Sequence, residues 1–201
     1  YNRRHHIAKQ QHAVERTREL FAKSLGYAKP ETQGDYAISQ HFLHGSQQTD
    51  APYLIFLHAT TRDDKHWPEA HWRELIGLLA NAGLRIKLPW GAPHEEARAK
   101  RLAAGFDYVD VLPRMKLDGV AQALAGATAV VSVDTGLSHL TAALDRPNIT
   151  LYGPTDPGLI GGYGKNQYIC RPEHSSQLSD LSAAAVFAQL EPLLAAERAY
   201  V

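Results

Sequence analysis

The sequence predicts an α/β fold, a Rossmann-like and mostly parallel β-sheet with helices on both faces. Three observations predict it. After Pro52, short apolar runs alternate with longer phrases that have helical spacing. The runs favour β-branched residues and do not alternate with polar ones, which is typical of strands buried on both faces. The 201 residues are 44% hydrophobic and 21% charged, the composition of a globular chain.

The composition also excludes several classes of protein. Lys and Arg number 21, and so do Asp and Glu. This balance argues against a disordered acidic tail and against a globally basic nucleic-acid binder, so we expect no nucleic acid as a partner. The lone Cys170 excludes an internal disulfide framework and fits a reducing compartment. The sequence contains neither a signal peptide nor an apolar run near the ~20 residues of a membrane span.

The beginning of the chain has its own character. Tyr1 stands where a start Met is usual, in the middle of a basic phrase, so we expect an excised piece of a longer protein. Residues 1–29 hold seven Lys or Arg and only two acidic residues. A basic arm on an otherwise acidic chain predicts that this segment meets an anion.

The first predicted element is an amphipathic helix over residues 6–25. Ile7, Val14 and Phe21 recur at helical spacing, and a glycine follows the last turn. The pattern then fails, because residues 30–52 are polar and rich in turn-forming residues, as in linkers. We therefore place a domain boundary in this stretch.

The remaining elements follow in order from the alternation of apolar and helical phrases. Pro68 stands in the first turn of one helix and Gly83 just after its end, an asymmetry that suits helix termini. Gly105 stops the next helix. We expect strands over residues 53–57, 84–88, 108–111, 129–133 and 149–152. We expect helices over residues 68–82, 94–104, 117–124 and 137–144, and a last helix over about 181–198.

The strongest local pattern is the apolar run 129–133 continuing into Asp134, Thr135 and Gly136 and then into a helix. Such a helix start leaves three N–H groups facing the sheet edge, and a glycine there lets an anion approach, so a phosphate or diphosphate is the natural ligand. A plainer interpretation is that Asp134 and Thr135 only cap the helix. Aspartic proteases also use Asp-Thr-Gly, but they pair two carboxylates in an all-β setting, and this triplet occurs once, at a strand-to-helix junction.

A second candidate is the loop that leaves the first predicted strand. Thr60, Thr61 and Lys65 bring two hydroxyls and an ammonium group, which are suitable donors to phosphate oxygens. This loop should lie at the same sheet edge as Gly136. Taken alone, it suggests a solvated loop whose cations pair with its own acidic residues. The expected convergence of the two loops favours an anion site instead.

Other candidates carry less weight. Glu95, in the first turn of the helix predicted over 94–104, either holds ribose hydroxyls or is simply stabilised by the helix dipole. Met115 either lines a base pocket or fills the core. Residues 158–165 resemble a Walker loop, but their spacing is wrong and Asn166 stands where Ser or Thr should bind Mg²⁺. The histidines show no metal-ligand spacing, so we predict neither a metal nor a cofactor.

Four longer phrases carry a resemblance to a known family. They are Phe56-Leu57-His58-Ala59-Thr60-Thr61-Arg62-Asp63-Asp64-Lys65-His66-Trp67, Lys87-Leu88-Pro89-Trp90-Gly91, Val133-Asp134-Thr135-Gly136-Leu137-Ser138-His139-Leu140-Thr141-Ala142-Ala143-Leu144 and Tyr152-Gly153-Pro154-Thr155-Asp156-Pro157. In this order they resemble the ADP-heptose–lipopolysaccharide heptosyltransferases, glycosyltransferase family 9. The resemblance runs from Tyr1 to about Arg171 and fades beyond it.

The resemblance implies both a fold and an activity. Members of this family have two Rossmann-like domains of the GT-B type, and this chain would be the C-terminal, donor-binding half. Residues 1–50 would be the end of the N-terminal acceptor domain plus the linker, 51–178 the ADP-heptose-binding domain, and 179–201 a helix returning toward the N-terminal domain. The implied reaction moves L-glycero-D-manno-heptose from ADP-heptose to the first Kdo of Kdo2-lipid A, with inversion and without a metal. The implied location is the cytoplasm, peripherally on the cytoplasmic face of the bacterial inner membrane.

The resemblance also implies roles for single residues. Thr60, Thr61 and Lys65 would hold the diphosphate, and Lys65 would stabilise the departing ADP. The other donor contacts would be Glu95 to the ribose, Met115 to the adenine region, Asp134 to the heptose hydroxyls, and Thr135, Gly136 and His139 to the diphosphate end.

One departure from the family is large. Its N-terminal domain, with the carboxylate that acts as general base, is missing from the sequence, so we expect no catalytic base here and no turnover by this chain alone. Arg4, His12 and Arg16 would face the acceptor's phosphates and carboxylates, or would lie on a solvated helix face. The last helix would lack a partner for its apolar face, and the complete enzyme would be a monomer. A second hypothesis is a non-catalytic nucleotide-sugar-binding module that works with a partner chain.

Overall fold

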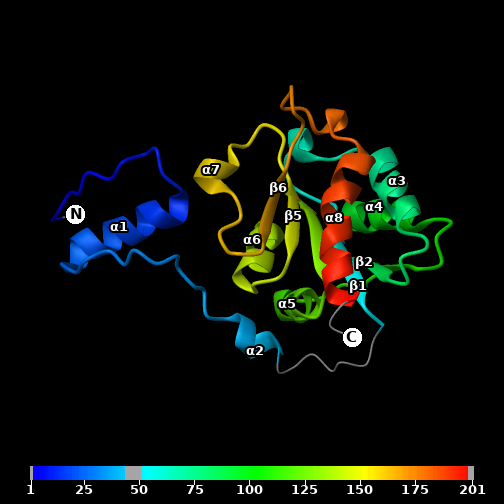
Figure 1. Ribbon diagram of the computed structural model, residues 1–201, viewed down its shortest axis with the longest axis horizontal. Coiled ribbons are helices and arrows are strands. Elements are labelled where there is room, and N and C mark those ends of the chain that lie inside the picture. Colours follow the sequence, from blue (N-terminus) through cyan, green and yellow to red (C-terminus); the bar gives the residue numbers. More distant parts are fainter. Residues whose placement is uncertain (1, 44–50, 199–201) are drawn as a thin grey trace.

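A single parallel sheet organises the chain. Figure 1 shows the computed structural model, and the structure describes residues 2–43 and 51–198. Within these ranges the sheet has six strands in the order β3-β2-β1-β4-β5-β6, and all neighbouring strands are parallel. The strands are β1 (Tyr53–Leu57), β2 (Arg85–Leu88), β3 (Val109–Val111), β4 (Ala129–Val133), β5 (Asn148–Leu151) and β6 (Gln167–Cys170). The Rossmann-like α/β fold predicted from the sequence is confirmed.

Helices connect the strands and cover both faces of the sheet (Figure 1). They are α1 (Ala13–Leu25), α2 (Ser39–Leu43), α3 (Glu69–Leu78), α4 (Pro93–Ala103), α5 (Leu117–Ala125), α6 (Gly136–Ala143), α7 (Pro157–Ile160) and α8 (Ala183–Arg198). Short 3₁₀ turns lie at Asp63–Lys65 and Leu178–Asp180. The helices α3 to α6 fall where the sequence predicts them, with small shifts at their ends.

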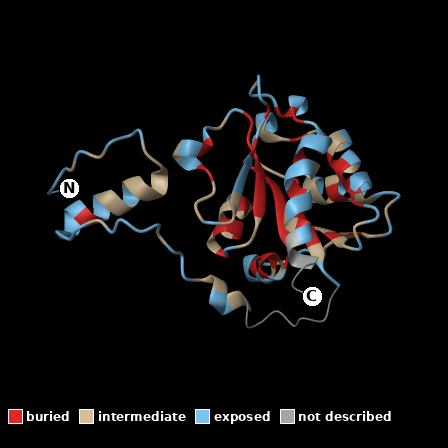
Figure 2. Cartoon of the chain, in the orientation of Figure 1, coloured by how far each residue is buried: buried red, intermediate tan, exposed pale blue. Residues whose placement is uncertain are grey.

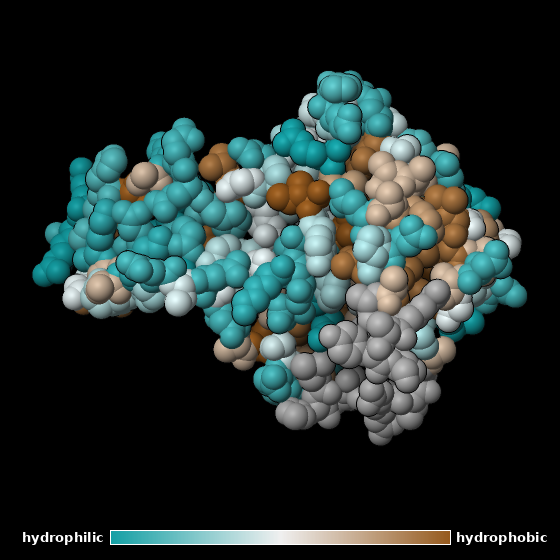
Figure 3. All heavy atoms as spheres, in the orientation of Figure 1, coloured by the Kyte–Doolittle hydropathy of each residue, from teal (hydrophilic) through white to brown (hydrophobic). Residues whose placement is uncertain are grey.

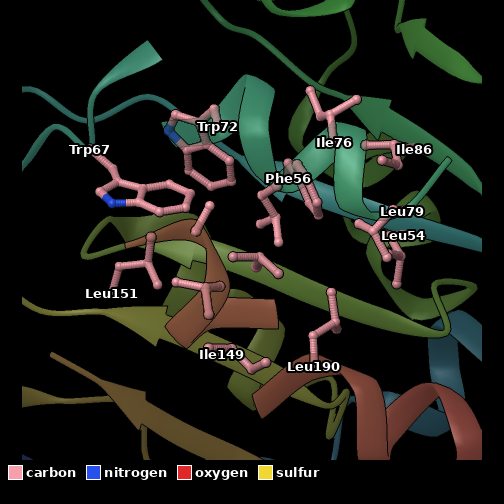
Figure 4. Close-up of a cluster of buried hydrophobic side chains, with 14 of the residues drawn as sticks. Leu54, Phe56, Trp67, Trp72, Ile76, Leu79, Ile86, Ile149, Leu151 and Leu190 are labelled. Atoms are coloured by element: carbon pink, nitrogen blue, oxygen red, sulfur yellow. The ribbon is translucent and has the colours of Figure 1, made fainter. Parts of the chain in front are cut away.

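Apolar cores lie on both faces of the sheet. In β1, Leu54 and Phe56 point into one core, and Ile55 and Leu57 point into the other. The first core is covered by α3, α4 and α8, and the second by α5 and residues around α6. Figure 4 shows the first core, in which Phe56 lies beside Trp72. Figure 2 shows the strands buried between the helical layers, which explains why they form continuous apolar runs in the sequence.

The last helix, α8, belongs to the first core. Val186, Leu190 and Leu194 are buried there, and the indole N–H of Trp67 donates to the carbonyl of Leu181 at 2.8 Å, just before the helix. The expectation that its apolar face would lack a partner is therefore wrong. The sheet face beside α3 is itself apolar, and α8 covers it (Figure 1).

The first helix is shorter than predicted. It begins at Ala13, and residues 2–12 are not helical. His12 has a non-helical backbone, and its Nδ1 accepts a hydrogen bond from the N–H of Val14 at 3.2 Å. A residue that caps a helix in this way ends it there, so the helix does not extend back to residue 6. At the other end, Gly26 adopts the expected left-handed conformation with φ of 77°.

The edge strand β6 was not predicted, and neither were α2 and α7. In β6, Tyr168 is 39% exposed and Ile169 is 52% exposed. An edge strand at the surface needs few buried apolar residues, so its sequence gives a weak pattern.

The segment before the linker lies at one end of the molecule beside α7 (Figure 1), and its surface in Figure 3 is mainly hydrophilic. Among the described helices, none is long and apolar enough to cross a membrane.

Candidate functional site

The candidate site lies where the direction of the chain through the sheet reverses. β1 and β4 are neighbours, but the chain leaves β1 toward β2 and leaves β4 toward β5, on opposite sides. Such a reversal opens a crevice at the carboxyl ends of the two strands. The loops after β1 and β4 meet there, because Thr60 Oγ1 donates to the carbonyl of Asp134 at 3.2 Å. The predicted convergence of the two loops is therefore present.

A partly buried ion pair links the same two loops. Lys65 Nζ donates to Asp134 Oδ2 at 2.6 Å, and the two side chains are only 15% and 7% exposed. Arg62 pairs instead with Asp64, and both of these side chains are exposed. The plainer interpretation of this loop thus describes Arg62, whereas Lys65 reaches across the crevice. Removing either member of this pair would leave the other charge without compensation.

A cavity of about 260 Å³ opens beside the two loops. Its lining residues are Leu57, His58, Ala59, Thr60, Thr61, Pro89, Trp90, Gly91, Glu95, Met115, Leu117, Val120, Thr135 and Leu137. Hydroxyl, carboxylate and imidazole groups thus share the wall with aliphatic and indole surface. A flat apolar ring that carries polar substituents fits such a mixed lining.

Five of the nine predicted donor-site residues line this cavity: Thr60, Thr61, Glu95, Met115 and Thr135. The pair of Lys65 and Asp134 adjoins it through Thr60 and Thr135. Gly136 stands between two lining residues, Thr135 and Leu137, in the first turn of α6. His139 lies farther along α6, half-buried, and does not line the cavity.

The first turn of α6 has an open approach. An added Cβ at Gly136 would meet nothing within 4 Å, so folding of the turn does not itself require a glycine. One expectation needs correction, because the N–H of Ser138 donates to the carbonyl of Thr135 at 3.1 Å. No residue that the structure describes accepts from the N–H of Gly136 or Leu137. Two N–H groups, rather than three, therefore remain for an anion.

Glu95 and Met115 each combine a structural contact with a place in the cavity wall. Glu95 Oε2 accepts from the N–H groups of Gly91 at 2.7 Å and Ala92 at 3.0 Å, so the carboxylate does cap α4. It lines the cavity as well. Met115 also lines the cavity and packs against the second core.

Sequence reasoning did not include His58, Trp90 or Gly91 among the site residues. His58 follows β1 directly, and Trp90 and Gly91 lie two and three residues after β2, at the edge where parallel sheets bind ligands, so that rule alone would have found them. The indole N–H of Trp90 donates to the carbonyl of Leu112 at 2.7 Å, which fixes the ring at the ends of β2 and β3.

His58 is unusual within the cavity wall. It is fully buried, and neither ring nitrogen has a hydrogen-bond partner among the described residues. Burial, helped by the positive charge of Arg98, lowers the pKa of His58 to about 4. The imidazole is therefore neutral near pH 7. An unpartnered buried polar group costs about 1–3 kcal/mol, so His58 makes this wall less stable than it could be.

The predicted acceptor-side residues lie away from the cavity. Arg4 is exposed and Arg16 is half-buried. Both ring nitrogens of His12 are engaged, Nδ1 by Val14 and Nε2 by the carbonyl of Gly161 at 3.0 Å. In the part of the chain that the structure describes, no group of three or more His, Cys, Asp or Glu could hold a metal ion.

Comparisons with known proteins agree with this geometry. The family model for glycosyltransferase family 9 (heptosyltransferase) matches residues 1–190. Lipopolysaccharide heptosyltransferase 1 of Salmonella typhimurium is 78% identical over 191 residues, which cover 94% of this chain and 60% of that relative. The structure of E. coli heptosyltransferase WaaC with ADP is 75% identical with a TM-score of 0.91, over 96% of this chain and 60% of that one. WaaC with ADP-2-deoxy-2-fluoro heptose is 73% identical with a TM-score of 0.87, over 96% and 59%.

These matches cover only part of each relative. The chain spans about 60% of the length of the relatives it matches. Conversely, the family model covers nearly the whole of this sequence. The sheet, the two converging loops and the family model all point the same way, and the chain belongs to glycosyltransferase family 9, the heptosyltransferase family.

Proposed function

We propose that this chain is the donor-binding part of a heptosyltransferase of lipopolysaccharide biosynthesis. The complete enzyme would move L-glycero-D-manno-heptose from ADP-heptose to the first Kdo of Kdo2-lipid A, with inversion and without a metal. The ligands of the two WaaC structures support a nucleotide-sugar donor, and the name of the Salmonella relative supports heptose as the transferred group. The acceptor and the stereochemistry come from the family resemblance.

One observation carries the donor assignment. The loop bearing Lys65 and the first turn of α6 meet at one cavity, where a cation and two unpaired N–H groups surround the approach to Gly136. Positive charge and backbone donors in this arrangement suit a diphosphate. Thr60, Thr61 and Thr135 would add hydroxyl donors at the same end.

The rest of the donor would lie along the cavity. The adenine ring would pack against Met115 and Trp90, on the apolar part of the lining. The ribose would reach Glu95, whose Oε1 has no hydrogen-bond partner among the described residues. The heptose hydroxyls would meet Asp134, and His139 would stand at the diphosphate end of α6.

These residues would act on the leaving group. When the bond between heptose and diphosphate breaks, negative charge grows on the β-phosphate. Lys65 and the N–H groups of Gly136 and Leu137 would stabilise that charge more strongly in the transition state than in the bound donor. Lys65 must first exchange Asp134 for phosphate oxygens. The general base that activates the acceptor hydroxyl would lie in the part of the enzyme outside this sequence.

The remaining parts of the proposal concern the whole enzyme. Residues 1–50 would close the acceptor domain and form the linker, residues 51–178 would bind the donor, and residues 179–201 would form a helix returning toward the N-terminal domain. Arg4 and Arg16 would face acceptor phosphates, and His12 would join them only after its present bonds break. The enzyme would act as a monomer, peripherally on the cytoplasmic face of the inner membrane.

Calorimetric titration of the 201-residue chain tests the donor assignment. ADP-heptose and ADP should bind, and GDP and UDP should bind more weakly, because the base would contact the cavity wall. A thermal melt followed by circular dichroism shows whether the sample is folded. A cooperatively melting chain that binds none of these ligands, or binds all nucleotides equally, would contradict the proposal.

A further inference from the structure

A row of buried polar side chains lies beneath α6, in a place where apolar packing is usual. In β5, Ile149 and Leu151 belong to the first core, so the alternate residues Asn148 and Thr150 point to the opposite face. Asn148 is 0% exposed and Thr150 is 2% exposed. Ser132 of β4 lies in register with Thr150 and is also fully buried.

These side chains form one hydrogen-bonded cluster, the polar seam, made of Ser132, Ser138, Asn148 and Thr150. Thr150 Oγ1 is its centre, 2.9 Å from Asn148 Nδ2, 3.3 Å from Ser132 Oγ and 3.3 Å from Ser138 Oγ. Asn148 also reaches Ser132 Oγ at 2.9 Å, the Ser138 carbonyl at 3.4 Å and Gln167 Oε1 at 3.2 Å. The seam therefore joins α6 to β4, β5 and β6.

Stability alone does not explain the seam. Replacing both partners of a buried hydrogen bond by apolar groups of the same shape is often nearly neutral or stabilising. Hydrogen bonds differ from apolar contacts in being directional, since they weaken steeply when the donor and acceptor move out of line. A cluster with several such bonds thus fixes the rotation and the height of α6 over the sheet, which apolar packing would leave looser.

The seam lies directly under the candidate anion site. Ser138 is in the first turn of α6, two residues after Gly136, so its position also sets the N–H groups of Gly136 and Leu137. Ser132 is the next-to-last residue of β4, and Asp134 follows directly after the end of the strand.

We propose that the polar seam, with Thr150 at its centre, is a positioning element for diphosphate binding. It holds the first turn of α6, with the N–H groups of Gly136 and Leu137, in place for the second phosphate. This inference rests on the proposed function, because it takes the first turn of α6 to be the diphosphate site.

The replacement Thr150→Val tests the inference, because it keeps the shape of the side chain and removes the central hydroxyl. The readout is the ratio of the dissociation constants of AMP and ADP, measured by titration calorimetry. AMP lacks the second phosphate, so the ratio reports the diphosphate contacts and not general stability. We expect AMP binding to change less than about twofold and ADP binding to weaken about five- to tenfold. This loss corresponds to the net contribution of about one hydrogen bond.

Two further variants serve as controls. Thr150→Ser keeps the hydroxyl and should preserve most of the ADP preference. Thr141→Val removes a buried hydroxyl of α6 outside the seam, whose one acceptor among the described residues is the Leu137 carbonyl at 2.9 Å, and should leave the ratio unchanged. If Thr150→Val does not fold, Ser138→Ala takes its place, because it removes only a peripheral bond of the seam.

The outcomes separate the two proposals. An unchanged ratio in folded Thr150→Val or Ser138→Ala overturns the positioning role, and so does an equal loss of AMP and ADP binding. A smaller ratio in Thr141→Val as well would overturn it too, since any buried hydroxyl of α6 would then have the same effect. An unmodified chain that binds AMP as tightly as ADP contradicts the diphosphate site itself, and with it the proposed function.

Discussion

Replacing Lys65 by methionine removes the ammonium group and keeps most of the length of the side chain. It therefore asks whether this cation holds a diphosphate. The Lys65 side chain is only 15% exposed, so water screens its charge less than at the surface. A hydrogen bond to a charged group contributes about 1.5–3 kcal/mol, which converts to weaker ADP binding by about 10- to 100-fold.

The partner of Lys65 sharpens this prediction. Asp134 Oδ2 lies 2.6 Å from Lys65 Nζ. Without the lysine, this carboxylate faces the phosphates with its charge uncompensated, so the loss should fall toward the upper end of the range. The double replacement Lys65→Met with Asp134→Asn removes that repulsion and should recover part of the ADP affinity. A cycle of the four chains then gives the coupling between the two side chains.

Titration calorimetry with ADP and adenosine measures the effect. Adenosine has no phosphate, so its affinity should stay within about twofold in every variant. Lys100→Met is the matched control, because Lys100 lies on the exposed face of α4, 65% exposed and paired with Glu96 at 2.8 Å. Unchanged ADP affinity in a cooperatively melting Lys65→Met chain would refute the assignment, and so would an equal loss in Lys100→Met.

Three further predictions test the site and the core. Gly136→Ala should melt like the parent chain, since its Cβ meets nothing within 4 Å, but should weaken ADP binding in calorimetry. Gly77→Ala, in the last turn of α3 and equally free of contacts, should not weaken it. The pKa of His58 is about 4 in the folded chain against 6.5 ordinarily, so the unfolded chain takes up its proton first. The contribution of His58 should therefore lower the free energy of unfolding by about 3 kcal/mol between pH 6.5 and pH 4. Urea titrations of His58→Leu at several pH values should show a free energy of unfolding that changes less with pH over that range. An unchanged pH dependence would contradict the assignment. Leu190→Ala changes a fully buried position of α8 and should lower the free energy of unfolding by about 2–5 kcal/mol in the same assay. Leu78 is 46% exposed, so Leu78→Ala should lower it by less than about 1 kcal/mol.

The parts of the fold that were predictable have strong local causes. β4 was expected over 129–133 and is found there, because a strand buried on both faces carries an unbroken apolar run. β6 was missed because it is an edge strand at the surface. Two of its four residues are exposed, so its sequence lacks a run of buried apolar residues. The start of α1 was misplaced because a histidine is a less common cap than Ser, Thr, Asp or Asn, so His12 gave no stop in the sequence.

The candidate site was predictable where chain order determines it. Loops after neighbouring parallel strands must meet at one edge, so Thr60 and Thr135 could be placed together before any coordinates. The pairing of Lys65 with Asp134 could not be predicted. The two residues are 69 positions apart, and each was predicted to have a separate role in binding a ligand. The polar seam was also missed. The strand was expected to begin at Ile149, which left the buried Asn148 outside it.

One aromatic side chain, Tyr163, ties the segment before the linker to the rest of the molecule. The hydroxyl of Tyr163, in the loop between β5 and β6, accepts from the N–H of Gly34 at 2.9 Å and from Arg18 at 3.3 Å, and it donates to Glu15. Lys29, this tyrosine and Arg18 together lower the pKa of Glu15 to about 2, so the carboxylate stays charged at neutral pH. The segment before the linker is thus tied to the loop between β5 and β6. Any movement of α1 relative to the sheet must either break the bonds of Tyr163 or carry its loop along.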